Sequence, residues 1–188
     1  MNITKYIVKQ IYKLDFADKN LSSDIYIYGI NTGIHILLNI AVIFAISLIL
    51  NKVTVCFEFF LFFIPLRSTS GGFHFSSKHI CTLVSTLIFV LILKCQNLIY
   101  INLNLFLIFA GFCIILIIMI PVTGSGIRKL DSYEISNFQS KKTKLIFLYI
   151  ISIFFLALLN RKHYITPILS AIILTAILLV IDLLVSKN

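Results

Sequence analysis

The segment YINLNLFLIFAGFCIILIIMIPV at residues 100–122 decides the fold class, because it carries no charged residue across 23 positions. A helix crosses the hydrocarbon core of a bilayer with about 20 apolar residues. Five other segments have a similar character: residues 26–50, 53–66, 80–98, 145–160 and 164–185. Residues 53–66 and 145–160 are short, so we expect them to tilt little or to enter the bilayer only partway. The sequence therefore predicts an all-α polytopic membrane protein with about six transmembrane helices.

The composition supports this class. The 188 residues are 60% apolar and 12% charged, with a mean hydropathy of +1.05, whereas soluble domains carry roughly 25% charged residues. The net charge of +9 does not indicate nucleic acid, because a nucleic-acid-binding protein gathers its cations on an exposed face and does not usually carry long apolar spans. We therefore expect a lipid bilayer and no nucleic acid as a partner.

The N-terminal residues 1–22 have the spacing of an amphipathic surface helix. Apolar and basic residues each recur every four positions, offset by two: Ile3, Ile7 and Ile11, and Lys5, Lys9 and Lys13. On a helix the two rows lie on roughly opposite sides, which suits an anionic membrane surface. The alternative is a frayed basic tail. We treat residues 1–188 as one membrane domain with a bundle at residues 23–188, and we expect no cleaved signal.

Most of the 16 Lys and Arg fall on one side of the six predicted segments if the N-terminus is cytoplasmic. The positive-inside rule then predicts a multi-pass protein of the cell membrane whose two termini and residues 67–81 and 124–144 are cytoplasmic. The 124–144 segment includes Arg128, Lys129, Lys141, Lys142 and Lys144. We interpret it as a solvated loop that sets orientation, or as a docking patch for an acidic peptide or lipid head group.

The candidate chemistry lies in RSTSGGFHFSSKHIC, residues 67–81. Ser76 or Ser77 would cap the next helix and place Cys81 in or just after its first turn, where the helix dipole favours a thiolate. On one straight helix His74 and Cys81 would be about 10.5 Å apart along the axis. The flexible Gly71–Gly72 pair allows an irregular or re-entrant loop that could bring His74 back over the thiol.

Other interpretations of this loop stay open. His79 is a competing base, although on a helix it points about 200° away from Cys81. The same histidines and cysteine could bind a metal, but zinc sites usually have three or four protein ligands and no fourth ligand with recognisable spacing is present. A purely structural loop is a further alternative. We expect no metal and no cofactor. The other cysteines lie in apolar surroundings: Cys56, Cys95 and Cys113.

Two intramembrane polar features favour a different class of function. Asn31, His35 and Asn39 form a stripe along residues 26–50, and Glu58 is the only carboxylate well inside residues 53–66. A stripe of this kind usually makes interhelical hydrogen bonds, which can also join two subunits of a homodimer. An intramembrane acid is a functional candidate, and orienting His74 is a weak alternative for Glu58. These residues could also line the pathway of a non-enzymatic transporter of small peptides or ions.

The loop residues resemble the signature of the accessory gene regulator B (AgrB) family of membrane cysteine endopeptidases, which mature quorum-sensing pheromone precursors. The matching features are an arginine, a glycine-containing turn, a histidine, hydroxyl residues, and a cysteine seven positions after the histidine: Arg67, Gly71, Gly72, His74, Ser76, Ser77 and Cys81. The number of spans, the N-terminal segment, and a proline followed by a basic loop, Pro121 through Lys144, are also similar to the family.

The resemblance implies that Cys81 is the nucleophile and His74 its general base. The expected activity is cleavage of a short amphipathic, AgrD-like precursor through an acyl-enzyme, followed by cyclisation to a thiolactone or lactone. Arg67 would either position a substrate carboxylate or anchor its span at the lipid interface. The basic loop with Arg128 and Lys129 would attract the acidic C-terminal segment of such a precursor.

Overall fold

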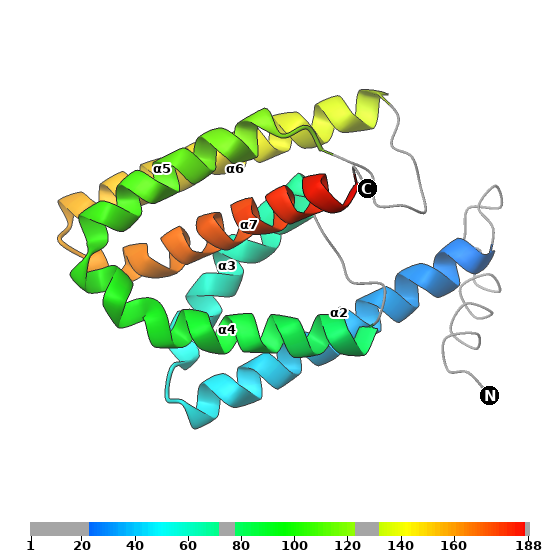
Figure 1. Cartoon of the computed structure of the whole chain (residues 1–188), viewed down its shortest axis with the longest axis horizontal. Coiled ribbons are helices and arrows are strands. Elements are labelled where there is room, and N and C mark those ends of the chain that lie inside the picture. Colours follow the sequence, from blue (N-terminus) through cyan, green and yellow to red (C-terminus); the bar gives the residue numbers. More distant parts are fainter. Residues whose placement is uncertain (1–22, 72–77, 123–131, 187–188) are drawn as a thin grey trace. The chain divides into compact units, whose positions relative to one another are not determined.

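The computed structural model describes residues 23–71, 78–122 and 132–186 (Figure 1). These residues form six α-helices and one short 3-10 helix, with no strand among them. The elements are α2 (Ser23–Ile49), α3 (Val53–Ser70), α4 (Lys78–Ile101), α5 (Leu103–Met119), α6 (Ser132–Leu158), η1 (Lys162–Tyr164) and α7 (Ile165–Ser186). The prediction of an all-α polytopic membrane protein is confirmed. The predicted N-terminal surface helix lies outside the described residues.

The chain divides into two compact units, Met1–Ile46 and Ser47–Asn188. The described part of the first unit is the helix α2 up to Ile46. Asn31, His35 and Asn39 are four apart on this helix and therefore share one face of it, as the sequence predicted. The hydrogen bonding of this stripe to another helix stays a prediction. Helices α3 to α7 belong to the second unit, which contains the candidate site.

The helix α7 is central to the second unit. It packs against α3, α4, α5 and α6 (Figure 1), and every residue from Ile165 to Ile172 is buried. This first part of α7 is buried on all sides, which requires apolar residues all round, and α7 has only one charged residue in its 22. Its buried hydroxyls bond within the bundle: Thr175 donates to the Ala171 carbonyl at 2.8 Å, and Ser170 accepts a hydrogen bond from Gln96 of α4 at 3.2 Å.

Among the described residues, four stretches are long and apolar enough to cross a membrane: Gly29–Ile49, Val53–Ser70, Ile80–Ile101 and Lys162–Val185. The second predicted segment is not short, because α3 continues for four residues past its predicted end, from Leu66 to Ser70. The predicted segment 100–122 is divided, because α4 extends to Ile101 and α5, which begins after Asn102, is 17 residues long. Many large apolar side chains on these helices are exposed, as lipid-facing side chains are.

The predicted loop 124–144 is wrong over its second half, because α6 begins at Ser132. The reason is visible in the spacing of its buried residues, Lys142, Ile146 and Tyr149, which lie four and three apart and therefore form one helical face. The hydropathy pattern misses the first half of this helix because most residues from Ser132 to Lys144 are polar, including Lys142 on the buried face. Lys142 is fully buried and is not available to an anionic partner. The predicted docking patch of five cations was therefore wrong to include it.

Two side chains of α6 bind the carboxyl-terminal end of α5. Gln139 donates to the Ile118 carbonyl at 3.0 Å, and the Lys142 ammonium donates to the Ile120 carbonyl at 2.7 Å. The last carbonyls of a helix have no partner within it, and cationic side chains interact favourably with that end of the helix dipole. The hydrogen bonds of Lys142 and Gln139 therefore connect α6 to the end of α5.

We expect this buried lysine to make stability depend on pH. Burial lowers the pKa of Lys142 from 10.5 to about 8. Between these values the unfolded chain holds a proton on this lysine that the folded chain has released, so the free energy of unfolding rises with pH from about 8 to 10.5. Thermal unfolding in detergent should show this gain in the wild type and lose it in Lys142→Met.

The matched control is Lys141→Met, which removes the neighbouring lysine, an exposed residue. This variant should keep the wild-type rise in unfolding temperature. An equal rise in Lys142→Met and in wild type would show that Lys142 does not titrate in this range.

Candidate functional site

The carboxyl-terminal turn of α3 is shaped by its own side chains. Pro65 lies inside the helix and cannot donate a backbone hydrogen bond. The Ser68 and Thr69 hydroxyls donate to the Pro65 carbonyl at 2.9 and 3.0 Å, and Tyr149 of α6 donates to the Phe62 carbonyl at 2.6 Å. These bonds, with the fully buried Leu66, fix the turn that carries Arg67.

Gly71 ends α3 in a conformation that favours glycine. Its φ is 73° and its ψ is −148°, a region that residues with a Cβ rarely enter. The Gly71 N–H donates to the Arg67 carbonyl at 3.1 Å, and the Arg67 guanidinium donates to the Gly71 carbonyl. Each of the two residues therefore donates a hydrogen bond to the other. These bonds hold the Arg67 side chain against the end of α3.

Cys81 is the fourth residue of α4 and lies in its first turn. Its side chain is partly exposed, whereas Cys56 and Cys113 are buried. Cys95 is exposed but lies far along the same helix. Among the four free cysteines, Cys81 alone combines access with a helix N-terminal position, which is where a cysteine is most easily activated.

Arg67 connects three helices electrostatically. The Asp182 carboxylate of α7 acts on the Arg67 charge more strongly than the Cys81 sulfur of α4 does. Sequence reasoning missed Asp182, which is the only charged residue of α7. The signal was available, because an ionisable residue inside an apolar span is by default a functional candidate. Its partner could not be found without the fold, since Asp182 lies more than 100 residues after Arg67.

The other predicted site residues lie outside the part of the chain that the structure describes. They are His74, Gly72, Ser76, Ser77, Arg128 and Lys129. The geometry of His74 relative to Cys81 therefore stays a prediction. Of the described predicted residues, Arg67 and Gly71 are bonded to each other, and Arg67 also acts on Cys81.

Glu58 has its electrostatic partner at a different place in the bundle. Its carboxylate interacts with His163 of η1, a residue that sequence reasoning did not single out. Glu58 precedes Arg67 by nine residues on α3, which is about 13.5 Å along a helix axis. One oxygen of the Glu58 carboxylate is buried and has no hydrogen-bond partner among the described residues.

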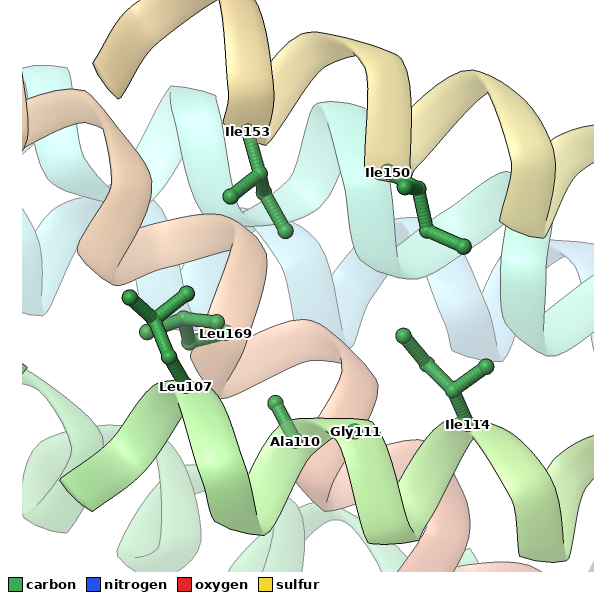
Figure 2. Close-up of a pocket in the computed structure, with 7 residues that line it drawn as sticks. All are labelled: Leu107, Ala110, Gly111, Ile114, Ile150, Ile153 and Leu169. Atoms are coloured by element: carbon green, nitrogen blue, oxygen red, sulfur yellow. The ribbon is translucent and has the colours of Figure 1, made fainter. Parts of the chain in front are cut away.

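A groove of about 170 Å³ lies between α5, α6 and α7 (Figure 2). Its walls are wholly apolar: Leu107, Ala110, Gly111, Ile114, Ile150, Ile153 and Leu169. Such a groove has no group that could act as acid, base or nucleophile. The chemistry-bearing side chains lie instead at the ends of α3, α4 and α7 that contain Arg67, Cys81 and Asp182.

The fold and this site define a polytopic helical membrane protein with an accessible cysteine near a partly buried arginine. The chain matches the model of the AgrB family, Accessory gene regulator B, over residues 1–182, and it belongs to that family. The resemblance seen in the sequence is therefore confirmed. AgrB proteins process the precursors of autoinducing peptides in quorum sensing, and these precursors are of the AgrD type. Comparisons with curated proteins and with solved structures give no match.

Proposed function

We propose that this chain is a membrane cysteine endopeptidase that cleaves an autoinducing-peptide precursor through an acyl-enzyme on Cys81 and supports cyclisation of the product. His74 is the general base. The observation that carries the proposal is the place of Cys81, in the first turn of α4 and within electrostatic reach of Arg67. The thiol is partly exposed at the start of a helix, so a substrate carbonyl can reach the sulfur that would attack it.

The first half-reaction exchanges an amide for a thioester. The Cys81 thiolate attacks the carbonyl carbon of the scissile peptide bond, so that a C–S bond forms and the C–N bond breaks. The protonated His74 imidazole gives its proton to the leaving amine. The amino-terminal part of the precursor remains on Cys81, and the carboxyl-terminal part departs as a free amine.

The second half-reaction closes the ring. Neutral His74 takes the proton from a thiol or hydroxyl within the bound fragment, and that sulfur or oxygen attacks the thioester carbonyl. The C–S bond to Cys81 breaks, the thiolate is regenerated, and a thiolactone or lactone leaves. Exclusion of water would favour this internal attack over hydrolysis, which gives a physical reason to carry out the reaction at a membrane boundary.

The proposed site faces the cytoplasm, as the positive-inside rule favours for residues 67–81 and 124–144. Lys141 and Lys144 of α6 are exposed and remain able to attract an acidic peptide segment. The buried Lys142 takes no part in this attraction. In this proposal the precursor approaches through its charged end and presents a peptide bond to Cys81.

Mass spectrometry of the peptide products tests the proposal. The chain is co-expressed with a candidate AgrD-type precursor in a host that lacks both, and peptides are extracted from the membrane fraction. The proposal predicts a fragment lighter by one water than the linear hydrolysis product. Accumulation of the linear fragment alone would refute the cyclising step, and an intact precursor with a correctly inserted chain would refute the peptidase.

A further inference from the structure

Helix α3 contains a proline two residues before Arg67. Pro65 has no N–H to donate to the Leu61 carbonyl, and its ring crowds that carbonyl. Sharp bends in helices usually occur at such positions, because the ladder of helical hydrogen bonds is interrupted there. Helix α3 therefore has a weak joint at Pro65, which we call the α3 hinge.

The last turn of α3, beyond the hinge, is held together by its own residues. The Ser68 and Thr69 hydroxyls donate to the Pro65 carbonyl, and Arg67 and Gly71 donate hydrogen bonds to each other. All of these bonds are local. They keep the shape of the turn, but they do not set its direction relative to the first part of α3.

Tyr149 of α6 contacts α3 on the other side of the hinge. Its hydroxyl donates to the Phe62 carbonyl at 2.6 Å, and its ring packs edge-on against the Phe62 ring with the centroids 5.2 Å apart. The Tyr149 side chain is 2% exposed, so water does not compete for this hydrogen bond. Prolines are tolerated in membrane helices because groups on neighbouring helices bond to the backbone near the break. Tyr149 supplies such a group.

The acceptor of this bond links the two parts of α3. In a regular helix the carbonyl of Phe62 accepts a hydrogen bond from the N–H of Leu66, which is the first residue beyond the hinge. The Tyr149 hydroxyl therefore holds the oxygen against which the last turn is built. Fixing this oxygen restricts the directions that the last turn can take.

We propose that the Tyr149 hydroxyl holds the α3 hinge closed, and that Tyr149 is thereby a positioning residue for the turn that contains Arg67 and Gly71. The candidate loop, residues 67–81, begins in this turn, so opening of the hinge moves the start of the loop relative to Cys81 of α4. This inference rests on the proposed function, because it predicts an effect on precursor cleavage. Its physical part, the restriction of the hinge, is measurable without substrate.

Hydrogen exchange of the full-length protein in lipid nanodiscs, followed by mass spectrometry, tests the physical part. Tyr149→Phe keeps the ring and removes only the hydroxyl. We expect amides of residues 66–71 to exchange about fivefold faster, which is the size of effect that one net hydrogen bond produces. Amides of α5 should keep their wild-type rates. The matched control is Tyr100→Phe, which removes the hydroxyl of a half-exposed tyrosine at the far end of α4 from Cys81 and should leave residues 66–71 unchanged.

The variant Pro65→Ala distinguishes a hinge from general packing. Alanine restores the missing N–H and removes the weak joint. In this background Tyr149→Phe should change the exchange of residues 66–71 by less than about twofold, because the hydroxyl and the proline act on the same joint and are not additive. A hydroxyl that only stabilised the packing of α6 would give the same acceleration with and without the proline.

Precursor cleavage at saturating precursor tests the positioning role. Tyr149→Phe should slow cleavage per inserted molecule by about fivefold, in step with the exchange of residues 66–71, and Tyr100→Phe should cleave at the wild-type rate.

Four results would overturn the proposal. They are unchanged exchange of residues 66–71 in Tyr149→Phe, an equal acceleration throughout α5, full acceleration in the Pro65→Ala background, and wild-type cleavage by a Tyr149→Phe chain whose last turn exchanges faster. The proposed function fails separately. Cleavage that survives in Cys81→Ala would refute the peptidase, and the exchange result would still decide whether the hydroxyl holds the hinge.

Discussion

Substitution of Cys81 by alanine should lower the rate of precursor cleavage by about 10³-fold or more, because it removes the atom that forms the acyl-enzyme. The helix should still insert, since Cys81 is partly exposed and belongs to no part of the buried cluster. Cleavage is measured by mass spectrometry of the precursor in membranes containing equal amounts of each variant. His74→Ala should give a comparable loss if this imidazole is the general base.

The chain offers a matched control on the same helix. Cys95 is a free, exposed cysteine of α4, and Cys95→Ala should cleave at the wild-type rate. Cys81→Ser replaces the thiol with a hydroxyl that is a far weaker nucleophile at neutral pH, so it should behave like Cys81→Ala. Wild-type cleavage in Cys81→Ala would remove the basis of the enzymatic account and direct attention to transport through His35 and Glu58.

The second large effect is expected at Gly71. Gly71→Ala places a Cβ on backbone with φ 73° and ψ −148°, which costs about 1–3 kcal/mol if the conformation is kept. If the backbone relaxes instead, the bonds that join Gly71 to Arg67 are disturbed. We therefore expect a free energy of unfolding that is lower by about 1–3 kcal/mol in detergent, and slower precursor cleavage per folded molecule because Arg67 is displaced.

Gly111→Ala is the matched control for this substitution. Gly111 lies in α5, and a methyl group on its Cα would meet open space, because no atom beyond the surrounding helix backbone is within 4 Å of that position. Alanine favours a helix interior over glycine by roughly 0.5–1 kcal/mol, so this variant should be as stable as wild type or slightly more so. Equal behaviour of the two alanine variants would show that the end of α3 does not need glycine.

The places of the helices could be predicted from the sequence because hydropathy reports burial in lipid directly. The prediction failed where a charged residue is buried. Lys142 looked like a loop residue, yet it lies on the packed face of α6 and binds the end of α5. Periodicity contained the missing signal, since Lys142, Ile146 and Tyr149 have helical spacing.

The site could be predicted only where its residues are close in the chain. The change from polar to apolar residues after Ser77 indicated a helix start near Cys81, and Gly71 indicated a special turn. Asp182 was beyond reach, because its relation to Arg67 is created by the packing of α7 on α3. A single sequence names residue types and local spacing, while pairs of distant residues come from tertiary structure.

The acyl-enzyme itself tests the central claim most directly. Wild-type membranes are mixed with precursor, quenched with acid within one turnover, digested, and searched by mass spectrometry for a precursor fragment on cysteine. We expect a hydroxylamine-sensitive adduct on Cys81, containing the amino-terminal side of the cleaved bond, and none on Cys56, Cys95 or Cys113. Cleavage without any adduct on Cys81, or with the adduct on another cysteine, would contradict the proposed mechanism.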